Sequence, residues 1–360
     1  MLVGAMTLMI FGVAAPVFIL SPIFDAQAPS FEYLRYVSEL LPAAGAELDP
    51  GVIAQVRAYP GTARVIPVVP MGICISVPPA NHPYVSINAV SEEDLRYLMD
   101  RLGLRLVEGR LPRPSTNEIV LSEALARNRG LHVGDSVGSP VYERDSMPFE
   151  MPIVGLLENK GMWMGFASLE FVQSHELTAD VPPDVFVAAG AEGQAALDAW
   201  LQDTLDARTT IVQTYAEVWA NMESQRSRML LVLAAVELLM AVIAAAALAV
   251  LNYIFYSQRR DEFGVLHALG RGRGWLTWRA GRETLVTTGM AWVFGAALCL
   301  TLMLGLQSAV YAPVGLSISL DGIAPWLFTL PIPLAVVAGS VATIGWMLRG
   351  LDSVAVIEGR

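Results

Sequence analysis

Four long apolar stretches dominate the pattern of hydrophobic and polar positions along the chain. They cover residues 1–24, 229–256, 284–307 and 326–348. A helix of about 20 apolar residues crosses a hydrocarbon core of about 30 Å, and each stretch reaches that length. The pattern therefore predicts four transmembrane helices, with a large polar block between the first and the second.

The first stretch has two interpretations. A secretory signal peptide carries a basic region before its apolar core and a small-x-small cleavage site soon after it. The run LVGAMTLMIFGVAAPVFIL has neither and is longer than a typical signal core. We therefore favour a retained anchor, and whether a cytoplasmic leader precedes it stays open.

Glu237 lies inside the second stretch. A helix over its 28 residues would measure about 42 Å, longer than the hydrocarbon core, so part of it must leave the bilayer. A carboxylate at the bilayer centre would be costly and would suggest a function. The apolar run after Glu237 can span by itself, so a position at the outer interface is the simpler interpretation.

Prolines and small residues mark the other spans. Pro331 and Pro333 lie in the outer part of the fourth span, where missing backbone donors should kink the helix or move its start inward. Alanine and glycine are dense at 244–249 and 295–297. This density predicts close helix packing, either within the chain or with another subunit.

The placement of arginine predicts the orientation in the membrane. Residues 257–283, between the second and third spans, carry six arginines, whereas residues 308–325 carry only Asp321 as a charged residue. Loops rich in Lys and Arg face the cytoplasm. We therefore expect 257–283 and both termini inside, and residues 25–228 outside, of the plasma membrane.

The outer block alternates strand-like and helix-like patterns. Strands are expected at 64–77, 84–90, 118–123 and 151–157, and helices are expected after the N-caps Asp49 and Ser91. Residues 191–223 should be mainly helical, and 213–228 should form a stalk helix that runs into the second span. The predicted fold is a multi-pass α-helical membrane protein with an α+β extracytoplasmic domain at 25–212 and a cytoplasmic tail at 349–360.

Composition agrees with this layout, because 54% of the residues are hydrophobic and only 16% are charged. The net charge of −11 is concentrated in the outer block, because residues 25–223 contain 27 acidic and 13 basic residues. Such a surface disfavours nucleic acid; it either attracts cationic partners or serves solubility alone. The two cysteines and four histidines show no metal-site spacing, and no catalytic constellation stands out, so we expect neither a metal site nor an enzyme.

The inner segment SQRRDEFGVLHALGRGRG has the most specific pattern in the chain. Phe263, Leu266 and Leu269 share one side, while the residues before them are charged. The pattern predicts a short amphipathic helix that ends at Gly270. Such a helix either floats at the lipid interface or docks into a groove of a cytoplasmic partner.

Here the sequence resembles a known family. RRDEFGVLHALG is similar to the R-R-x-E-x-G-x-L-x-A-L-G element of FtsX-like ABC transporter permeases. Residues 106–137 resemble a run of the MacB-type extracytoplasmic core domain, MPIVGLLEN resembles the strand after it, and LDSVAVIEGR resembles the ending of these permeases. The sequence departs from the family at Ser353, where Pro is common, and at 271–274, which affects the fit to an ATPase.

The resemblance implies a permease subunit that lies in membrane lipid and forms a homo- or heterodimer. Each copy would bind a separate ABC ATPase through its coupling helix. The implied coupling positions are Arg260, Glu262, Phe263, Gly264, Leu266, Ala268, Leu269 and Gly270. ATP and Mg²⁺ would bind the ATPase, and this chain would bind no cofactor. In agreement, the sequence has no G-x-x-x-x-G-K-[ST] motif. An extracytoplasmic accessory protein is a further candidate partner.

The run MWMGF lies in what should be a loop of the outer block. Met162, Trp163, Met164 and Phe166 are candidates for an outer contact with an apolar ligand or partner. Core packing is the alternative interpretation of the same residues.

Two functions fit this sequence. In the first, motion of the ATPase passes to the outer domain by mechanotransmission and moves an amphiphilic substrate, such as a lipid, lipoprotein, peptide or drug. In the second, the chain is an FtsX-type regulator that activates a cell-wall hydrolase and transports nothing. The size of the outer domain and its likeness to the MacB-type core favour the first.

Overall fold

The chain folds into two compact units. The computed structural model describes residues 2–43, 47–78, 83–158, 161–191, 193–258, 269 and 272–349. A helical unit comprises Met1–Ser21, Arg226–Gln307 and Ile318–Arg360, and a sheet unit comprises Pro22–Gln225 and Ser308–Ser317. The sheet unit is therefore built mainly from the block between the first two apolar stretches, together with one short segment from much later in the sequence.

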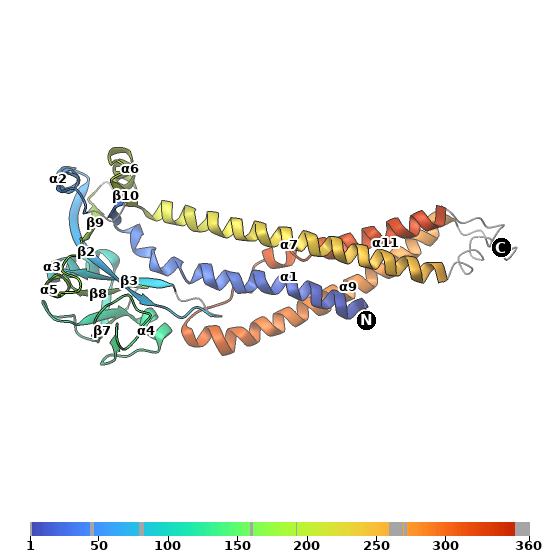
Figure 1. Cartoon of the computed structure of the whole chain (residues 1–360), viewed down its shortest axis with the longest axis horizontal. Coiled ribbons are helices and arrows are strands. Elements are labelled where there is room, and N and C mark those ends of the chain that lie inside the picture. The colour runs from blue at the N-terminus through green and yellow to red at the C-terminus, as the bar shows by residue number, and fades with distance from the viewer. Residues whose placement is uncertain are drawn as a thin grey trace. The chain divides into compact units, whose positions relative to one another are not determined.

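Long helices form most of the helical unit (Figure 1). They are α1 (Leu2–Asp25), α7 (Tyr215–Gln258), α9 (Arg273–Leu306) and α11 (Pro331–Arg349), with the short α10 (Ala324–Leu327) before the last. Among the described residues, four helical segments are long and apolar enough to cross a membrane: Val3–Leu20, Tyr215–Leu251, Thr277–Val314 and Pro325–Trp346. The prediction of four spans is confirmed.

Small residues allow α9 to approach α1 closely within the helical unit. A Cβ added at Gly295 would lie 2.9 Å from Ile10 Cβ and 3.0 Å from the carbonyl oxygen of Thr7. One turn away, Thr7 Oγ1 donates a hydrogen bond of 3.3 Å to the carbonyl oxygen of Ala291, which is fully buried. The close packing expected at 295–297 is thus confirmed, because only glycine fits at this approach.

The prolines of the fourth span set the start of its last helix. α10 ends at Leu327 and α11 begins at Pro331, because a proline at the first helical position lacks only an N–H that would have no intrahelical partner. Between the two helices, Trp292 Nε1 donates to Thr329 Oγ1 at 2.9 Å. The predicted inward shift of the helix start is confirmed.

The sheet unit has the α+β fold predicted from its sequence. Its strands are β1 (Ser38–Pro42), β2 (Thr62–Cys74), β3 (Tyr84–Val90), β4 (Arg105–Gly109), β5 (Ile119–Ser122), β6 (Ser136–Val137), β7 (Met151–Glu158), β8 (Gly165–Ser168), β9 (Asp184–Ala189) and β10 (Thr210–Gln213). Its helices are α2 (Pro50–Ala58), α3 (Glu92–Leu102), α4 (Glu123–Arg129), α5 (Leu169–Ser174) and α6 (Gln194–Thr204). Short 3-10 turns η1 (Ala28–Ser30) and η2 (Glu32–Arg35) precede β1.

Local sequence signals account for the starts of two helices. The Asp49 carboxylate accepts a hydrogen bond of 2.8 Å from Gly51 N at the start of α2. The Ser91 hydroxyl accepts one of 3.2 Å from Asp94 N at the start of α3. Both predicted N-caps are therefore confirmed, since each side chain satisfies a backbone donor that has no partner in the helix.

In the described residues, the strands form one mixed sheet in the order β10-β1-β9-β2-β3-β8-β5-β7-β4, with β6 paired to β7. Most neighbours are antiparallel, but β3 pairs with β8 and β5 pairs with β7 in parallel. The long strand β2 joins the two halves of the sheet. Its first part, to Val68, pairs with β9, and its second part, from Val69, pairs with β3.

The alternation of side chains along β9 places them in two different hydrophobic cores of the sheet unit. Val185, Val187 and Ala189 pack in one core with buried side chains of α2 and α6. Phe186 and Ala188 point the other way, into the core that α3 covers. This arrangement follows from the strand period of two residues.

Two of the expected elements differ from the structure. The strand expected at 64–77 ends at Cys74, because the backbone of Ser76 bonds to the side chain of Asn128 and not to a neighbouring strand. The region expected to be mainly helical, 191–223, contains β10, which pairs with β1. The β-branched run of Thr210, Ile211 and Val212 explains this strand.

Candidate functional site

The predicted coupling segment lies between two long helices, since α7 ends at Gln258 and α9 begins at Arg273. Leu269 is described and is 74% exposed. The other predicted coupling positions lie outside the described residues; they are Arg260, Glu262, Phe263, Gly264, Leu266, Ala268 and Gly270. Their role in coupling therefore stays a prediction.

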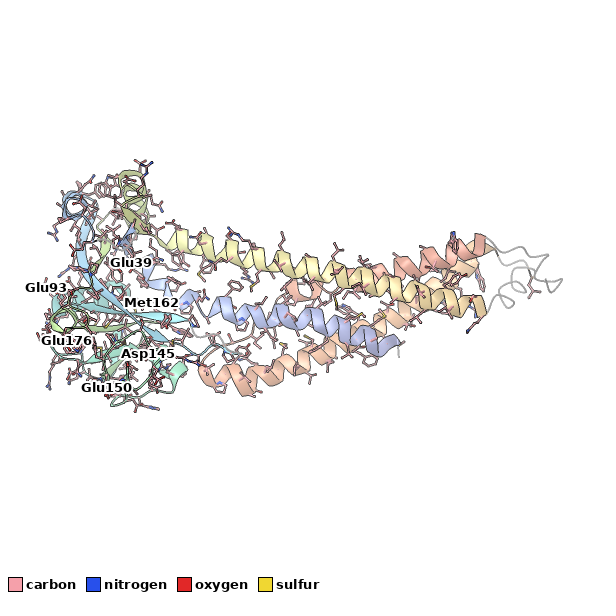
Figure 2. All side chains as sticks on the ribbon, viewed as in Figure 1. Glu39, Glu93, Asp145, Glu150, Met162 and Glu176 are labelled. Atoms are coloured by element: carbon pink, nitrogen blue, oxygen red, sulfur yellow. The ribbon has the colours of Figure 1, made fainter. Side chains whose placement is uncertain are left out.

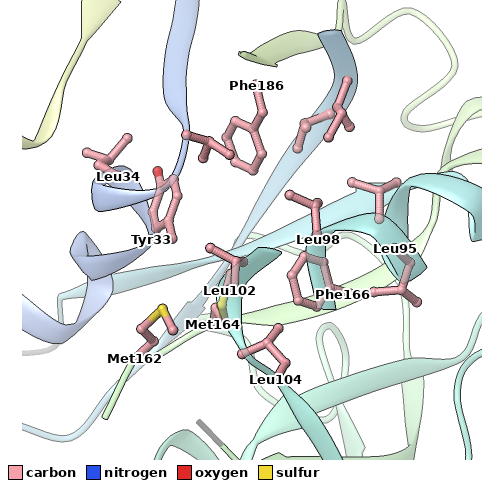
Figure 3. Close-up of a cluster of buried hydrophobic side chains, with 14 of the residues drawn as sticks. Tyr33, Leu34, Leu95, Leu98, Leu102, Leu104, Met162, Met164, Phe166 and Phe186 are labelled. Carbon is pink, nitrogen blue, oxygen red and sulfur yellow. The ribbon is translucent and has the colours of Figure 1, made fainter. Parts of the chain in front are cut away.

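The four side chains of the MWMGF run are buried inside the sheet unit. Met162, Trp163, Met164 and Phe166 are between 0% and 5% exposed. Figure 3 shows three of them in the core beneath α3, together with Phe186. In place of the outer contact surface considered above, the structure shows part of a hydrophobic core, and a ligand could reach these side chains only if that core opened.

A buried ion pair organises the loops beside β2 in the sheet unit. Asp145 (labelled in Figure 2) has a fully buried side chain and faces Arg129 Nη1 at 2.8 Å. The same carboxylate accepts hydrogen bonds from Cys74 N at 2.9 Å and from Gly138 N at 3.1 Å. The Arg129 guanidinium also lies 4.0 Å from the centre of the Tyr142 ring. Asp145 thus holds three separate stretches of chain.

The surroundings of this ion pair are polar and partly open. A cavity of about 380 Å³ borders Cys74, Asn128, Tyr142 and Arg144. Burial raises the pKa of the Cys74 thiol, whose sulfur lies 3.0 Å from the carbonyl oxygen of Arg144. The thiol is therefore held neutral and is not a nucleophile at physiological pH. Sequence reasoning missed this cluster, because its members are scattered along the chain without a recognisable spacing.

A second polar cluster lies between β1 and β9. Tyr33 donates its hydroxyl to Glu39 Oε2 at 2.8 Å, and burial raises the pKa of Tyr33 well above its ordinary value. Burial raises the pKa of Glu39 to about 7; the Tyr33 hydrogen bond lowers it and the nearby Asp184 raises it further. Burial likewise raises the pKa of Asp184 to about 6. The sheet unit therefore contains two carboxyl groups that titrate near neutral pH.

We expect Glu39→Gln to make the sheet unit less sensitive to pH. Between the ordinary pKa of 4.5 and about 7, folded Glu39 keeps a proton that the unfolded chain has lost, so stability falls as the pH rises through this window. The difference between these two pKa values lowers the free energy of unfolding by roughly 3 kcal/mol above pH 7. Glutamine still accepts the Tyr33 hydrogen bond without a charge, so the variant should melt higher than the parent at pH 8 and at nearly the same temperature at pH 4.5.

The measurement is the melting temperature of the full chain in detergent from pH 4.5 to 8. Asp203→Asn is the matched control, because Asp203 is exposed and its neutralisation should leave the pH profile unchanged. A Glu39→Gln profile that falls with pH as steeply as the parent profile would show that Glu39 is not the titrating group.

Glu237 is buried in the helical unit, and the structure places it in α7. Its side chain is 4% exposed, and Oε1 has no hydrogen-bond partner among the described residues. Ala241 and Ala244 follow at helical spacing and are also buried, so Glu237 lies on the face of α7 that packs against other helices. A buried carboxyl in a span is a candidate functional residue.

Among the described residues, no group of three or more His, Cys, Asp or Glu side chains is placed to hold a metal ion. Cys74 and Cys299 are free and buried.

Comparison with known proteins connects the helical unit to a family. The family described as FtsX-like permease C-terminal matches residues 234–352, a range that includes α9, α11 and the predicted coupling segment. No curated protein sequence matches the chain. Similar solved structures include the periplasmic region of MacB from Actinobacillus actinomycetemcomitans, with 13% identity over 52% of this chain and 92% of that chain and a TM-score of 0.32.

A second similar structure is the extracellular domain of the ABC-type transporter YknZ from Gram-positive bacteria. It shares 12% identity over 49% of this chain and 100% of that chain, with a TM-score of 0.31. The assignment rests on the family match, whose range runs from the middle of α7 to the tail. Residues 234–352 are thus similar to the C-terminal part of FtsX-like permeases.

Proposed function

We propose that the chain is the membrane subunit of an ABC transporter, and that it passes ATP-driven motion of a separate ATPase to the sheet unit outside the cell. The sheet unit would then move an amphiphilic substrate such as a lipid, lipoprotein, peptide or drug. The observation that carries the proposal is α7, which runs unbroken from Tyr215 to Gln258, next to the predicted coupling segment. One helix thus connects the end that meets the ATPase with the domain that would move.

The first turns of α7 are embedded in the sheet unit. Val218 is buried in the core beneath α3, and Tyr215 and Met222 pack against the same core. The boundary between the two units falls inside the helix, between Gln225 and Arg226. A tilt or rotation of α7 would therefore act directly on the core side chains.

The chain segments that enter and leave the sheet unit are also joined to each other. In η2, which follows α1, Glu32 and Arg35 form an ion pair. The Arg35 guanidinium lies 4.2 Å from the centre of the Tyr215 ring at the start of α7. This contact ties the segment after α1 to the start of α7, so both should move the sheet unit together.

Partners and location follow from the same proposal. The arginines of 257–283 support a cytoplasmic position for this segment and for both termini. ATP and Mg²⁺ would bind the ATPase, and two permease chains, identical or related, would form the dimer. An accessory protein outside the cell would meet the sheet unit.

The test is co-purification of an ABC ATPase with the affinity-tagged chain from its native membranes. Leu266→Asp should weaken retention of the ATPase at least about tenfold, because burying a leucine contributes about 1.5–3 kcal/mol and 1.4 kcal/mol is a factor of ten. Glu262→Arg should act in the same direction by reversing a charge. His267→Gln is the control, because His267 is not one of the implied coupling positions. Equal retention by the parent and both variants would contradict the coupling assignment.

A further inference from the structure

Asn128, in the last turn of α4, joins two segments that are far apart in the sequence. It is 4% exposed. Its Oδ1 accepts a hydrogen bond of 2.8 Å from Ser76 N, and its Nδ2 donates one of 3.1 Å to Ser76 O. The other Nδ2 bond, of 2.8 Å, goes to the carbonyl oxygen of Val314. The amide thus pairs with Ser76 as a strand neighbour would and keeps one donor for Val314.

Val314 belongs to the segment 308–317, which follows α9 in the sequence and leads toward α10 and α11. This segment is part of the sheet unit, although the residues on both sides of it belong to the helical unit. Tyr311 donates its hydroxyl to Pro78 O at 3.2 Å and is 2% exposed. Leu316 is 8% exposed, and its N–H bonds to Tyr311 O at 3.0 Å.

Only a few residues attach segment 308–317 to the rest of the sheet unit. Gly315 has a positive φ of 73°, which suits glycine and forms the turn just before the buried Leu316. Most other residues of 308–317 are exposed, and Val314 borders the 380 Å³ cavity described above. A few side chains therefore hold this segment.

We propose that segment 308–317 is a latch, closed by Asn128 and Tyr311, through which the third and fourth spans act on the sheet unit independently of α7. The role of the latch in coupling rests on the proposed function, but its existence does not. α1 and α7 reach the sheet unit as continuous chain, whereas the latch attaches by side-chain contacts. Of these three attachments, the latch is therefore the one that a single substitution can release while the backbone connections stay intact.

The first test measures whether the latch holds in the full chain. A cysteine at Leu316 should react slowly with a maleimide in nanodiscs, since the native cysteines are buried and the new thiol would be buried too. Asn128→Asp, which cannot donate to Val314, should raise the rate at least about tenfold. Tyr311→Phe removes only the bond to Pro78 O and should raise it about fivefold.

Two controls separate release of the latch from unfolding. Asn117→Asp changes an exposed amide of the same unit, bonded to Glu150 O at 3.4 Å, and should leave the labelling rate unchanged. Tyr311→Phe removes no group from α4 or the sheet, so its melting temperature should match the parent and its labelling result stands even if Asn128→Asp unfolds. A Leu316→Cys chain that labels as fast as one with a cysteine at the exposed Ala196 would overturn the latch.

The second test measures coupling in the complex with the co-purified ATPase. A fluorophore on Ala196→Cys in α6 reports ATP-driven change at the sheet unit. Tyr311→Phe should reduce this signal at least about twofold while retaining the ATPase. If Tyr311→Phe speeds labelling at Leu316 but leaves the fluorescence change intact, the latch has no role in coupling. If the parent complex itself shows no ATP-driven fluorescence change, the result counts against the proposed function.

Discussion

Replacing Asp145 by asparagine should destabilise the sheet unit by about 3–5 kcal/mol, the cost of breaking a buried ion pair on one side. Asparagine has the same shape, but its NH2 group replaces one of the two carboxylate oxygens, which between them accept from Arg129, Cys74 and Gly138. The Arg129 side chain, 9% exposed, would keep its charge without an anionic partner. Only one acceptor oxygen would remain for the three stretches of chain.

The measurement is the first thermal transition of the full chain in detergent, which should fall by roughly 10 °C, at about 2–4 °C per kcal/mol for a unit of this size. Glu123→Gln is the matched control, because it breaks another ion pair of α4, the helix that contains Arg129. Its ion pair with Arg127 is exposed on both sides, at 49% and 63%, so the change should cost less than about 1 kcal/mol.

A double variant separates charge from packing. Arg129→Met with Asp145→Leu removes both charges and should be less destabilising than Asp145→Asn, because no unpaired ion remains. A double variant that melts lower than the single one would indicate that the hydrogen bonds to Cys74 and Gly138, and not the ion pair, carry the stability.

Ser227→Pro should abolish the ATP-driven change at the sheet unit while leaving the ATPase bound. Ser227 is exposed on α7, just after the boundary between the two units. A proline there removes one hydrogen bond, clashes with the carbonyl of Glu223, and kinks or breaks the helix at a cost of about 3 kcal/mol. If α7 transmits motion as one rigid element, the kink would absorb that motion.

The fluorophore on Ala196→Cys provides the readout, and the expected loss is at least about tenfold. Ser227→Ala is the control, because alanine preserves the helix and should give the parent signal. Co-purification of the ATPase should remain at the parent level in both variants. A full signal from Ser227→Pro would mean that the sheet unit is driven without α7, and the proposal based on its continuity would have to be given up.

The sequence predicted the spans and the edges of several elements because their causes are local. The span helices follow from the length of apolar runs, the start of α11 follows from Pro331, and the starts of α2 and α3 follow from their N-caps. The early end of β2 was missed, because it depends on Asn128, which lies far along the chain. The strand β10 was missed because four residues are too few to show a period.

The candidate functional residues that the sequence did not reveal likewise depend on contacts between distant parts of the chain. For Phe166 and its neighbours the sequence offered an outer contact and core packing as alternatives, and the structure shows core packing. The Asp145 and Glu39 clusters form only when the chain folds, since their partners come from separate segments. Nothing near Asn128 in the sequence marks it as a contact for Val314, because the two residues meet only in the folded chain.

The inner strand β9 contributes side chains to two cores at once, and this constrains how the protein can evolve. Adding or deleting one residue in β9 would turn every later side chain to the opposite face. Phe186 would then replace a valine on the side of α2 and α6, and both cores would be mispacked together. By contrast, every residue of β4, at the edge of the sheet, is exposed. Changes in chain length should therefore accumulate among homologues near β4 and be absent from β9.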